Sequence, residues 1–141
     1  MAAYIFVDMD DTLALGARVN ERVAQFMAQE HAAGKRVAIV SGRQISRMQE
    51  TRDWLQEHGL FEYVDEIHLS DFPAGPNASR EFKMYKAKLI EGRGNRIALV
   101  IENDAETRDA YRALGLEAIA PSRVPVVDGG WVDPTEDNNG R

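Results

Sequence analysis

The chain contains no cysteine, and this absence excludes three kinds of chemistry. Disulfide bonds, thiolate metal sites and a cysteine nucleophile all require a residue that the chain does not have. The chain also lacks an apolar run approaching the roughly 20 residues that a membrane-spanning helix needs. Its N-terminus lacks the basic and then apolar layout of a signal peptide. These absences favour a soluble, cytoplasmic protein without a membrane partner.

Basic residues are in the minority, with 17 Lys and Arg against 23 Asp and Glu and a formal net charge of −6. A protein that holds nucleic acid mainly by electrostatic attraction normally carries a basic patch, so this balance disfavours that class. It does not exclude a nucleotide or a nucleic-acid end as a substrate. The 141 residues, 44% of them hydrophobic, suit one compact domain with a single core.

Strand-like and helix-like segments alternate along most of the chain. Apolar, partly β-branched segments predict five strands, at residues 3–8, 36–40, 65–69, 96–101 and 116–120. Apolar residues at helical spacing lie between them, at residues 19–34, 44–57, 80–91 and 104–114. Repeated strand–helix units predict a three-layer α/β/α, Rossmann-like domain with a central parallel sheet of about five strands.

We predict that this domain spans residues 1–122. The remainder, residues 123–141, is predicted to form a short hairpin and then a flexible tail, because Asp and Gly at 128–130 favour a tight turn.

Carboxylates crowd the end of the first predicted strand, where the stretch VDMDDT contains Asp8, Asp10 and Asp11. Residues two apart on an extended chain point the same way, so Asp8 and Asp10 can face one pocket. A divalent cation would offset their repulsion, and hard oxygen ligands suit Mg²⁺. For this motif taken alone, a solvated acidic loop without a functional role is the simpler alternative.

The second predicted strand ends in VSGR, which is suited to an anion. The hydroxyl of Ser41 can donate to an anionic oxygen, Gly42 allows close approach of the backbone, and the N–H groups at the start of the next helix attract phosphate. The spacing of Ser41 and Gln44 also fits a capping box for that helix. The two interpretations are compatible.

The fourth predicted strand runs into Glu102, Asn103 and Asp104, which are either oxygen ligands or the cap of the next helix. On the preceding helix, Lys83 and Lys86 are the cations that can reach the strand ends, and Lys83 is the better placed of the two. Ligands of open α/β sheets bind beyond the carboxyl ends of the strands. We therefore expect all of these strand ends to converge on one site.

Taken together, these motifs resemble the haloacid dehalogenase (HAD) superfamily of phosphohydrolases. VDMDDT is similar to its D-x-D-x-T signature, VSGR to its second motif and the lysine of EFK to its third, and VIEND takes the place of its acidic fourth motif. The motifs follow the family's order over residues 4–116. The chain is most similar to capless phosphatases of the kind found in the 3′-phosphatase domain of phage polynucleotide kinase.

This resemblance implies a phosphomonoester hydrolase that works through an aspartyl-phosphate intermediate. Asp8 would be the nucleophile. Asp10 would protonate the leaving oxygen and then activate the hydrolytic water. The residues around the substrate would be Thr12, which would steady the loop, together with Ser41, Gly42, Arg43 and Lys83.

The resemblance also implies Mg²⁺, held by Asp8, the backbone carbonyl of Asp10 and an acidic group of the fourth motif. The family usually has aspartate there, often a pair, whereas this chain has Glu102 and Asn103, followed by Asp104. All three stay candidate ligands. One formal charge fewer would weaken Mg²⁺ binding, so a catalytically weak or inactive module that binds phosphate or regulates a partner is the alternative function.

Neither interval between the motifs has room for a cap domain, so the site is expected to be open. An open site admits bulky substrates or needs an oligomer or partner to close it, and the resemblance points to nucleotide or nucleic-acid 3′-phosphate ends. A receiver-like signalling domain also uses an aspartyl-phosphate, but its aspartate follows the third strand, whereas Asp8 follows the first. Asp11 replaces the family's common glycine, and we expect this change to be tolerated.

Overall fold

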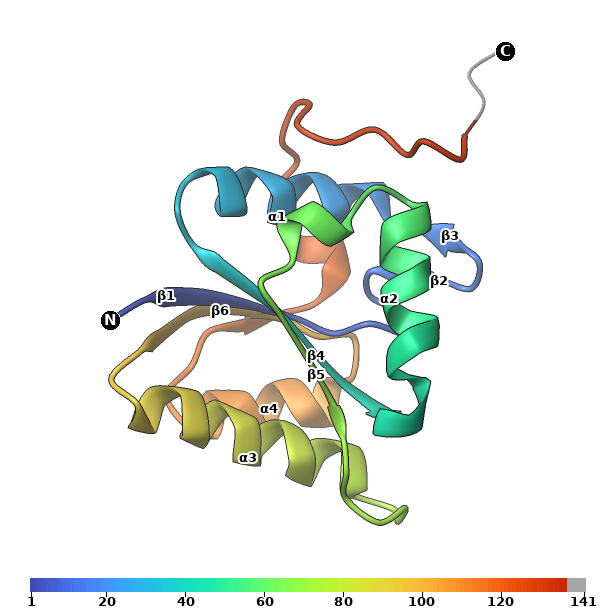
Figure 1. The fold of residues 1–141 in the computed structure, drawn as a ribbon. Helices are drawn as coiled ribbons and strands as arrows, with labels where there is room; N and C mark the ends of the chain where they lie inside the picture. The colour runs from blue at the N-terminus through green and yellow to red at the C-terminus, as the bar shows by residue number, and fades with distance from the viewer. Residues whose placement is uncertain (137–141) are drawn as a thin grey trace.

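A five-stranded parallel sheet forms the centre of the protein (Figure 1). The computed structural model describes residues 1–136. The strands lie in the order β5-β4-β1-β6-β7, and every neighbouring pair is parallel. Their bounds are β1 Ala3–Val7, β4 Arg36–Gln44, β5 Glu66–Ser70, β6 Arg96–Ile101 and β7 Ala118–Ile119. The predicted parallel sheet of five strands is confirmed.

Four α-helices cover the two faces of this sheet, with α1 and α2 on one face and α3 and α4 on the other (Figure 1). Their bounds are α1 Glu21–Ala32, α2 Met48–Glu57, α3 Ala78–Gly92 and α4 Ala105–Ala113. Alternate residues of β1 serve opposite faces, because side chains alternate along a strand. Ile5 and Val7 belong to the core under α1 and α2, whereas Tyr4 and Phe6 pack with residues of α3 and α4. None of the helices in the described part of the chain is long and apolar enough to cross a membrane.

The smaller elements show that residues 1–136 contain no cap domain. An antiparallel pair, β2 (Ala14–Leu15) and β3 (Arg18–Val19), lies with α1 between β1 and β4. Two short 3-10 helices, η1 (Ile45–Arg47) and η2 (Phe61–Tyr63), flank α2, and a third, η3 (Pro121–Arg123), follows β7. The expectation of a capless arrangement therefore holds for the part of the chain that the structure describes.

The prediction of a capping box after the second strand was wrong. The strand continues as β4 to Gln44, whose side chain caps no helix, and α2 begins only at Met48. The cause is pairing with β5, in which Ser41 lies opposite Leu69 and, after a register shift, Gln44 lies opposite Ser70. Since Ser41 and Gly42 are strand residues and only the short η1 follows β4, no α-helix begins directly after them to attract phosphate.

The predicted hairpin near residue 128 was also wrong, because residues 120–136 contain no strand. Instead, Trp131 is buried in the core on the α1 and α2 side, and its indole N–H donates to the backbone oxygen of His58 at 2.9 Å. The ring nitrogen Nδ1 of His58 lies 2.9 Å from Oδ2 of Asp133. Residues 133–136 of the predicted flexible tail thus belong to the described structure, and residues 137–141 lie outside it.

Replacing Trp131 by Ala tests whether this segment is part of the core. Because Trp131 is only 5% exposed, we expect Trp131→Ala to lower the free energy of unfolding by about 3 kcal/mol. Val132, which is 77% exposed, provides the matched control, and Val132→Ala should change the free energy of unfolding by less than about 0.5 kcal/mol. Urea denaturation followed by circular dichroism measures both. Equal effects of the two substitutions would show that the segment does not pack as described.

Candidate active site at the carboxyl edge of the sheet

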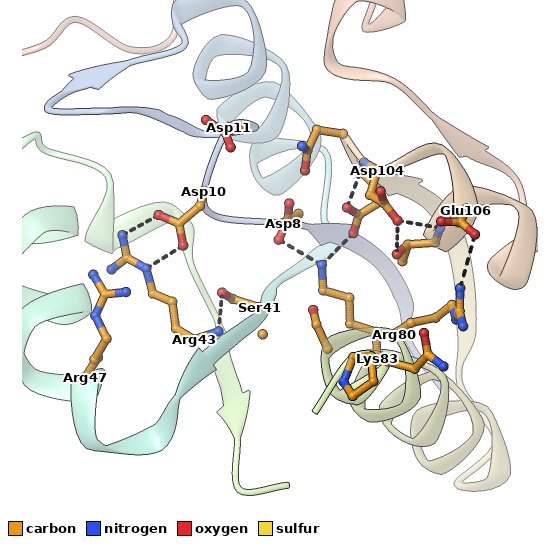
Figure 2. A pocket seen from close by; sticks show the side chains of 17 residues that line it. Asp8, Asp10, Asp11, Ser41, Arg43, Arg47, Arg80, Lys83, Asp104 and Glu106 are labelled. Atoms are coloured by element: carbon orange, nitrogen blue, oxygen red, sulfur yellow. Dashed lines mark hydrogen bonds and ion pairs between the residues drawn. The ribbon is translucent and has the colours of Figure 1, made fainter. Parts of the chain in front are cut away.

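A polar cavity of about 560 Å³ opens where the central strands end (Figure 2). Its walls come from the loop after β1, the end of β4, the start of α3 and the loop after β6. The structure brings nearly all of the predicted site residues to this cavity: Asp8, Asp10, Ser41, Gly42, Arg43, Lys83, Glu102, Asn103 and Asp104. Thr12 lies behind the wall, fully buried.

A buried ion cluster lies at the centre of this cavity (Figure 2). Nζ of Lys83 is 3.0 Å from Oδ1 of Asp8 and 2.7 Å from Oε1 of Glu102. The three residues are 4%, 7% and 1% exposed, respectively. Burial alone would lower the pKa of Lys83, but the negative charges of Asp8 and Glu102 outweigh it and raise that pKa. Lys83 therefore stays a cation beside the carboxylate of Asp8.

Burial and the neighbouring charge of Asp8 also raise the pKa of Glu102. The second candidate cation of the sequence, Lys86, lies away from this cluster, 5.7 Å from the ring centroids of Phe82 and Tyr85. Of the two lysines, Lys83 is therefore the one that reaches the strand ends.

Gly42 allows α3 to approach the sheet closely enough to deliver Lys83. A Cβ atom at position 42 would lie 2.2 Å from Oγ and 2.6 Å from Cβ of Ser79, far inside normal contact distance. Since Ser79 is in the first turn of α3, a side chain at position 42 would push that helix outward. Close packing thus explains why position 42 is a glycine. Contact between Gly42 and substrate stays a prediction.

Asp10 and Arg43 form a two-pronged ion pair on the other side of the cavity (Figure 2). Nε and Nη2 of Arg43 donate to the two carboxylate oxygens of Asp10 at 2.9 and 2.8 Å. These hydrogen bonds lower the pKa of Asp10. Nη1 of Arg43 donates to the hydroxyl of Thr51, which is buried on α2 and donates in turn to the backbone oxygen of Arg47. Sequence reasoning missed Thr51, although a polar residue on the apolar side of its predicted helix was the available signal.

The residues after β6 divide into two roles. Oδ2 of Asp104 accepts hydrogen bonds from the backbone N–H and hydroxyl of Thr107 at 2.9 and 2.7 Å, so this aspartate caps α4 and its pKa is lowered. Glu102 and Asn103 turn toward Asp8 instead. The Asn103 amide lies 2.8 Å from Oδ2 of Asp8 and 3.2 Å from Oε2 of Glu102, where its nitrogen donates to both carboxylates.

The loop after β1 is shaped by Thr12 and Asp11. The hydroxyl of Thr12 donates to Oδ2 of Asp8 at 3.0 Å and fixes the orientation of that carboxylate. Asp11 has φ of 61°, in the left-handed region that glycine adopts most easily and aspartate tolerates. This conformation gives the physical reason why glycine suits the position. Asp11 lines the cavity but is exposed and joins neither ion pair.

The side chains at the ends of β1 and β6 include groups of the kind that could hold a magnesium ion. In the described residues 1–136, no three His, Cys, Asp or Glu side chains form a metal-ligand group. Two carboxylates and one amide do converge, however, because the Asn103 amide faces both Asp8 and Glu102. If the amide turns so that its oxygen faces them, the three groups form a set of hard oxygen donors of the kind that Mg²⁺ prefers.

Comparison with protein-family models gives no match, and comparison with curated proteins gives none either. Solved structures do match. A chain of the Pnkp1/Rnl/Hen1 RNA repair complex superposes with a TM-score of 0.72 and 19% identity, over 85% of this chain and 42% of that one. A haloacid dehalogenase-like hydrolase from Streptococcus pneumoniae superposes with a TM-score of 0.53 and 12% identity, over 85% of this chain and 84% of that one. An uncharacterized protein from Listeria monocytogenes serotype 4b superposes with a TM-score of 0.57 and 19% identity, over 90% of this chain and 86% of that one.

These similarities establish the fold. The chain has the α/β fold of haloacid dehalogenase-like hydrolases, as the resemblance of its motifs predicted, and lacks a cap domain within residues 1–136. It spans less than half of the matched chain from the RNA repair complex.

The packing at Gly42 can be tested by adding one methyl group. We expect Gly42→Ala to lower the free energy of unfolding by about 1–3 kcal/mol, because the new Cβ overlaps Ser79. Gly75 has open space around it, so Gly75→Ala is the matched control and should change stability by less than about 0.5 kcal/mol. Chemical denaturation measures both variants. A neutral Gly42→Ala would mean that α3 does not press on β4 at this point.

Proposed function

We propose that this protein is a Mg²⁺-dependent phosphomonoester hydrolase that forms an aspartyl-phosphate on Asp8. The observation that supports this most directly is the buried cluster in which Lys83 and Thr12 fix the two oxygens of Asp8 at the floor of an open polar cavity. A positioned carboxylate beside a fixed cation suits attack on a phosphorus atom that is itself surrounded by negative oxygens.

In the proposed reaction, an oxygen of Asp8 bonds to phosphorus while the bond from phosphorus to the ester oxygen breaks. The departing oxygen takes a proton from Asp10, giving an alcohol. A water molecule then attacks the aspartyl-phosphate and gives one proton to Asp10. The bond between phosphorus and Asp8 breaks, and inorganic phosphate leaves. Lys83 offsets negative charge on the phosphoryl oxygens in both steps, and Ser41 can donate to one of them.

The ion pair between Asp10 and Arg43 has a part in this proposal. While Arg43 holds both oxygens of Asp10, the carboxylate has a lowered pKa and is a poor proton donor. A phosphate group entering the cavity offers Arg43 a competing two-pronged partner. Transfer of the guanidinium to the substrate would release Asp10 to take up and deliver the proton.

Mg²⁺ would be held by Asp8, Glu102 and Asn103, and when bound it supplies positive charge against the phosphoryl oxygens. We do not include the side chains of Asp10 and Asp104 among its ligands, because Arg43 and Thr107 hold them elsewhere. The backbone carbonyl of Asp10 stays a candidate.

We propose nucleotide or nucleic-acid 3′-phosphate ends as the substrate class. The open, uncapped cavity admits a bulky group, and Arg47 and Arg80 add positive charge to its lining. The structural similarity to a chain of an RNA repair complex supports the same class. A second copy or another protein that closes the open site is part of this proposal.

A non-catalytic module that binds phosphate is the second candidate. It is favoured by Asn103, a neutral group where a third carboxylate would strengthen Mg²⁺ binding, and by Lys83, which already pairs with both buried carboxylates. Calorimetric titration with Mg²⁺ separates the two, because a protein that binds no Mg²⁺ and hydrolyses no ester fits only the second.

Removing the proposed nucleophile tests the first candidate. We expect wild-type protein with Mg²⁺ to release phosphate from p-nitrophenyl phosphate, and Asp8→Asn to reduce the rate by roughly 1,000-fold or more. Asp11→Asn is the matched control, because asparagine tolerates the same backbone conformation and should leave the rate within about twofold of wild type. A substantial rate in Asp8→Asn would exclude Asp8 as the nucleophile.

Replacing the Asn103 amide by a carboxylate tests the metal site. We expect Asn103→Asp to tighten Mg²⁺ binding by roughly tenfold, because the site gains a charged oxygen ligand. Asp104→Asn is the control, since asparagine also caps helices and the affinity should not change. Isothermal titration calorimetry measures both dissociation constants. Weaker Mg²⁺ binding in Asp104→Asn than in wild type would instead assign the ligand to residue 104.

A further inference from the structure

A second cavity, of about 500 Å³, lies beside the edge strand β7, and all of its charged lining is positive. Its lining consists of Arg108, Arg112, Ile119, Ala120 and Arg123. Two of the arginines come from α4 and the third from η3. In a chain with 23 acidic residues, a cavity lined by three arginines and no carboxylate needs an explanation.

Backbone carbonyl groups hold two of these arginines in place. Nη1 of Arg108 donates to the backbone oxygens of Glu102 and Asn103 at 3.0 and 2.8 Å. Nη2 of Arg112 donates to the backbone oxygen of Ala118 at 2.7 Å. Side chains fixed in this way lose less conformational entropy when a ligand binds than free surface arginines do. The cavity therefore presents cations that are already oriented.

The positive charge of this cavity is only partly balanced. Arg108 and Arg112 are four residues apart on α4 and share one face, so their charges repel each other. Arg112 has an acidic partner, Asp109, at 3.2 Å. Within residues 1–136, neither Arg108 nor Arg123 has a carboxylate within 4.0 Å. A bound anion would remove this imbalance, and guanidinium groups match the oxygen geometry of phosphate.

The cavity is also placed beside the candidate active site. Arg108 binds the backbone of Glu102 and Asn103, whose side chains line the first cavity. One short loop therefore forms part of the wall of one cavity and anchors an arginine of the other. Both cavities lie where strands of the same parallel sheet end, one after β1, β4 and β6 and the other after β7.

We propose that the cavity of Arg108, Arg112 and Arg123 binds a second phosphate group of the substrate, apart from the one that is hydrolysed. This inference rests on the proposed function and narrows its substrate class. The preferred substrates carry at least one further phosphate, as a phosphodiester chain does. An ester with a single phosphate, such as p-nitrophenyl phosphate, occupies the first cavity alone.

Arg123→Gln is the variant that tests this site. The side chain of Arg123 is exposed and makes none of the hydrogen bonds that support the active-site loop, whereas replacing Arg108 would disturb that loop. Arg93→Gln is the matched control: it removes the same charge from an exposed position at the end of α3, before β6 and outside both cavities.

The probe is a short, fluorescein-labelled, single-stranded oligonucleotide with a 3′-phosphate, bound to protein that carries Asp8→Asn to prevent turnover. We expect Arg123→Gln to weaken binding by roughly 3- to 10-fold and to reduce the slope of log affinity against log salt by about 1. Arg93→Gln should leave both quantities unchanged. Fluorescence anisotropy at several salt concentrations measures them. Equal losses in the two variants would indicate a general charge effect and overturn the inference.

Kinetics with Asp8 intact provide the second readout. We expect Arg123→Gln to raise KM for the 3′-phosphorylated oligonucleotide and to leave kcat/KM for p-nitrophenyl phosphate unchanged. Binding of inorganic phosphate can be followed by NMR. If Arg123→Gln weakens this binding but changes neither the affinity nor the KM for the oligonucleotide, the cavity binds free phosphate and the assignment to substrate is wrong.

The two proposals can fail separately. If the protein hydrolyses p-nitrophenyl phosphate but its oligonucleotide affinity does not depend on Arg123, the inference alone is wrong. If the protein hydrolyses no phosphate ester, the proposed function is wrong, and an affinity that still depends on Arg123 would support the phosphate site by itself.

Discussion

A buried ammonium group between two carboxylates organises the carboxyl edge of this sheet. Val7 of β1 lies opposite Ile101 of β6, so the next residues, Asp8 and Glu102, leave neighbouring strands side by side. Two desolvated carboxylates at this spacing would repel each other strongly without a cation. Lys83 provides it, and removing Lys83 would leave two buried carboxylates without a cation. Gly42 lets α3 bring Lys83 to this cluster, Thr12 orients Asp8 within it, and Asn103 turns toward both of its carboxylates.

Two further carboxylates of the cavity, Asp10 and Asp104, are also held by partners within the protein. Arg43 holds Asp10, and Thr107 holds Asp104. Under the proposed function, a phosphate substrate would exchange partners with Arg43 to reach Asp10. Thr51, which supports Arg43 from α2, is among the residues that position the site.

The net charge of the chain gives little information about how its charges are distributed. A formal charge of −6 disfavours a protein that holds nucleic acid by attraction alone, yet three arginines gather in one cavity without a lining carboxylate. The loop of Glu102 and Asn103 connects that cavity to the candidate active site. Local electrostatic fields depend on which side chains the fold brings together, and at short range they outweigh the effect of the net charge.

The sequence by itself determined the alternation of strands and helices, the parallel sheet and the set of strand ends that meet at one edge. Apolar runs and helical spacing are local patterns, and the carboxyl ends of parallel strands share one edge whatever the side chains are. It also identified Asp8, Ser41 and Lys83 as candidate site residues. Asp8 and Ser41 stand at the ends of predicted strands, and Lys83 lies on a predicted helix from which it can reach those ends.

Only the tertiary structure decided which partner each of these side chains takes. Asp10 pairs with Arg43, and Asp104 caps α4 while Glu102 meets Lys83, because strand register and helix packing fix distances between residues far apart in the chain. The same holds for the extension of β4 by pairing with β5 and for the burial of Trp131, which replaced the expected hairpin. Local periodicity carries no information about such contacts, since they exist only after the separate segments have packed together.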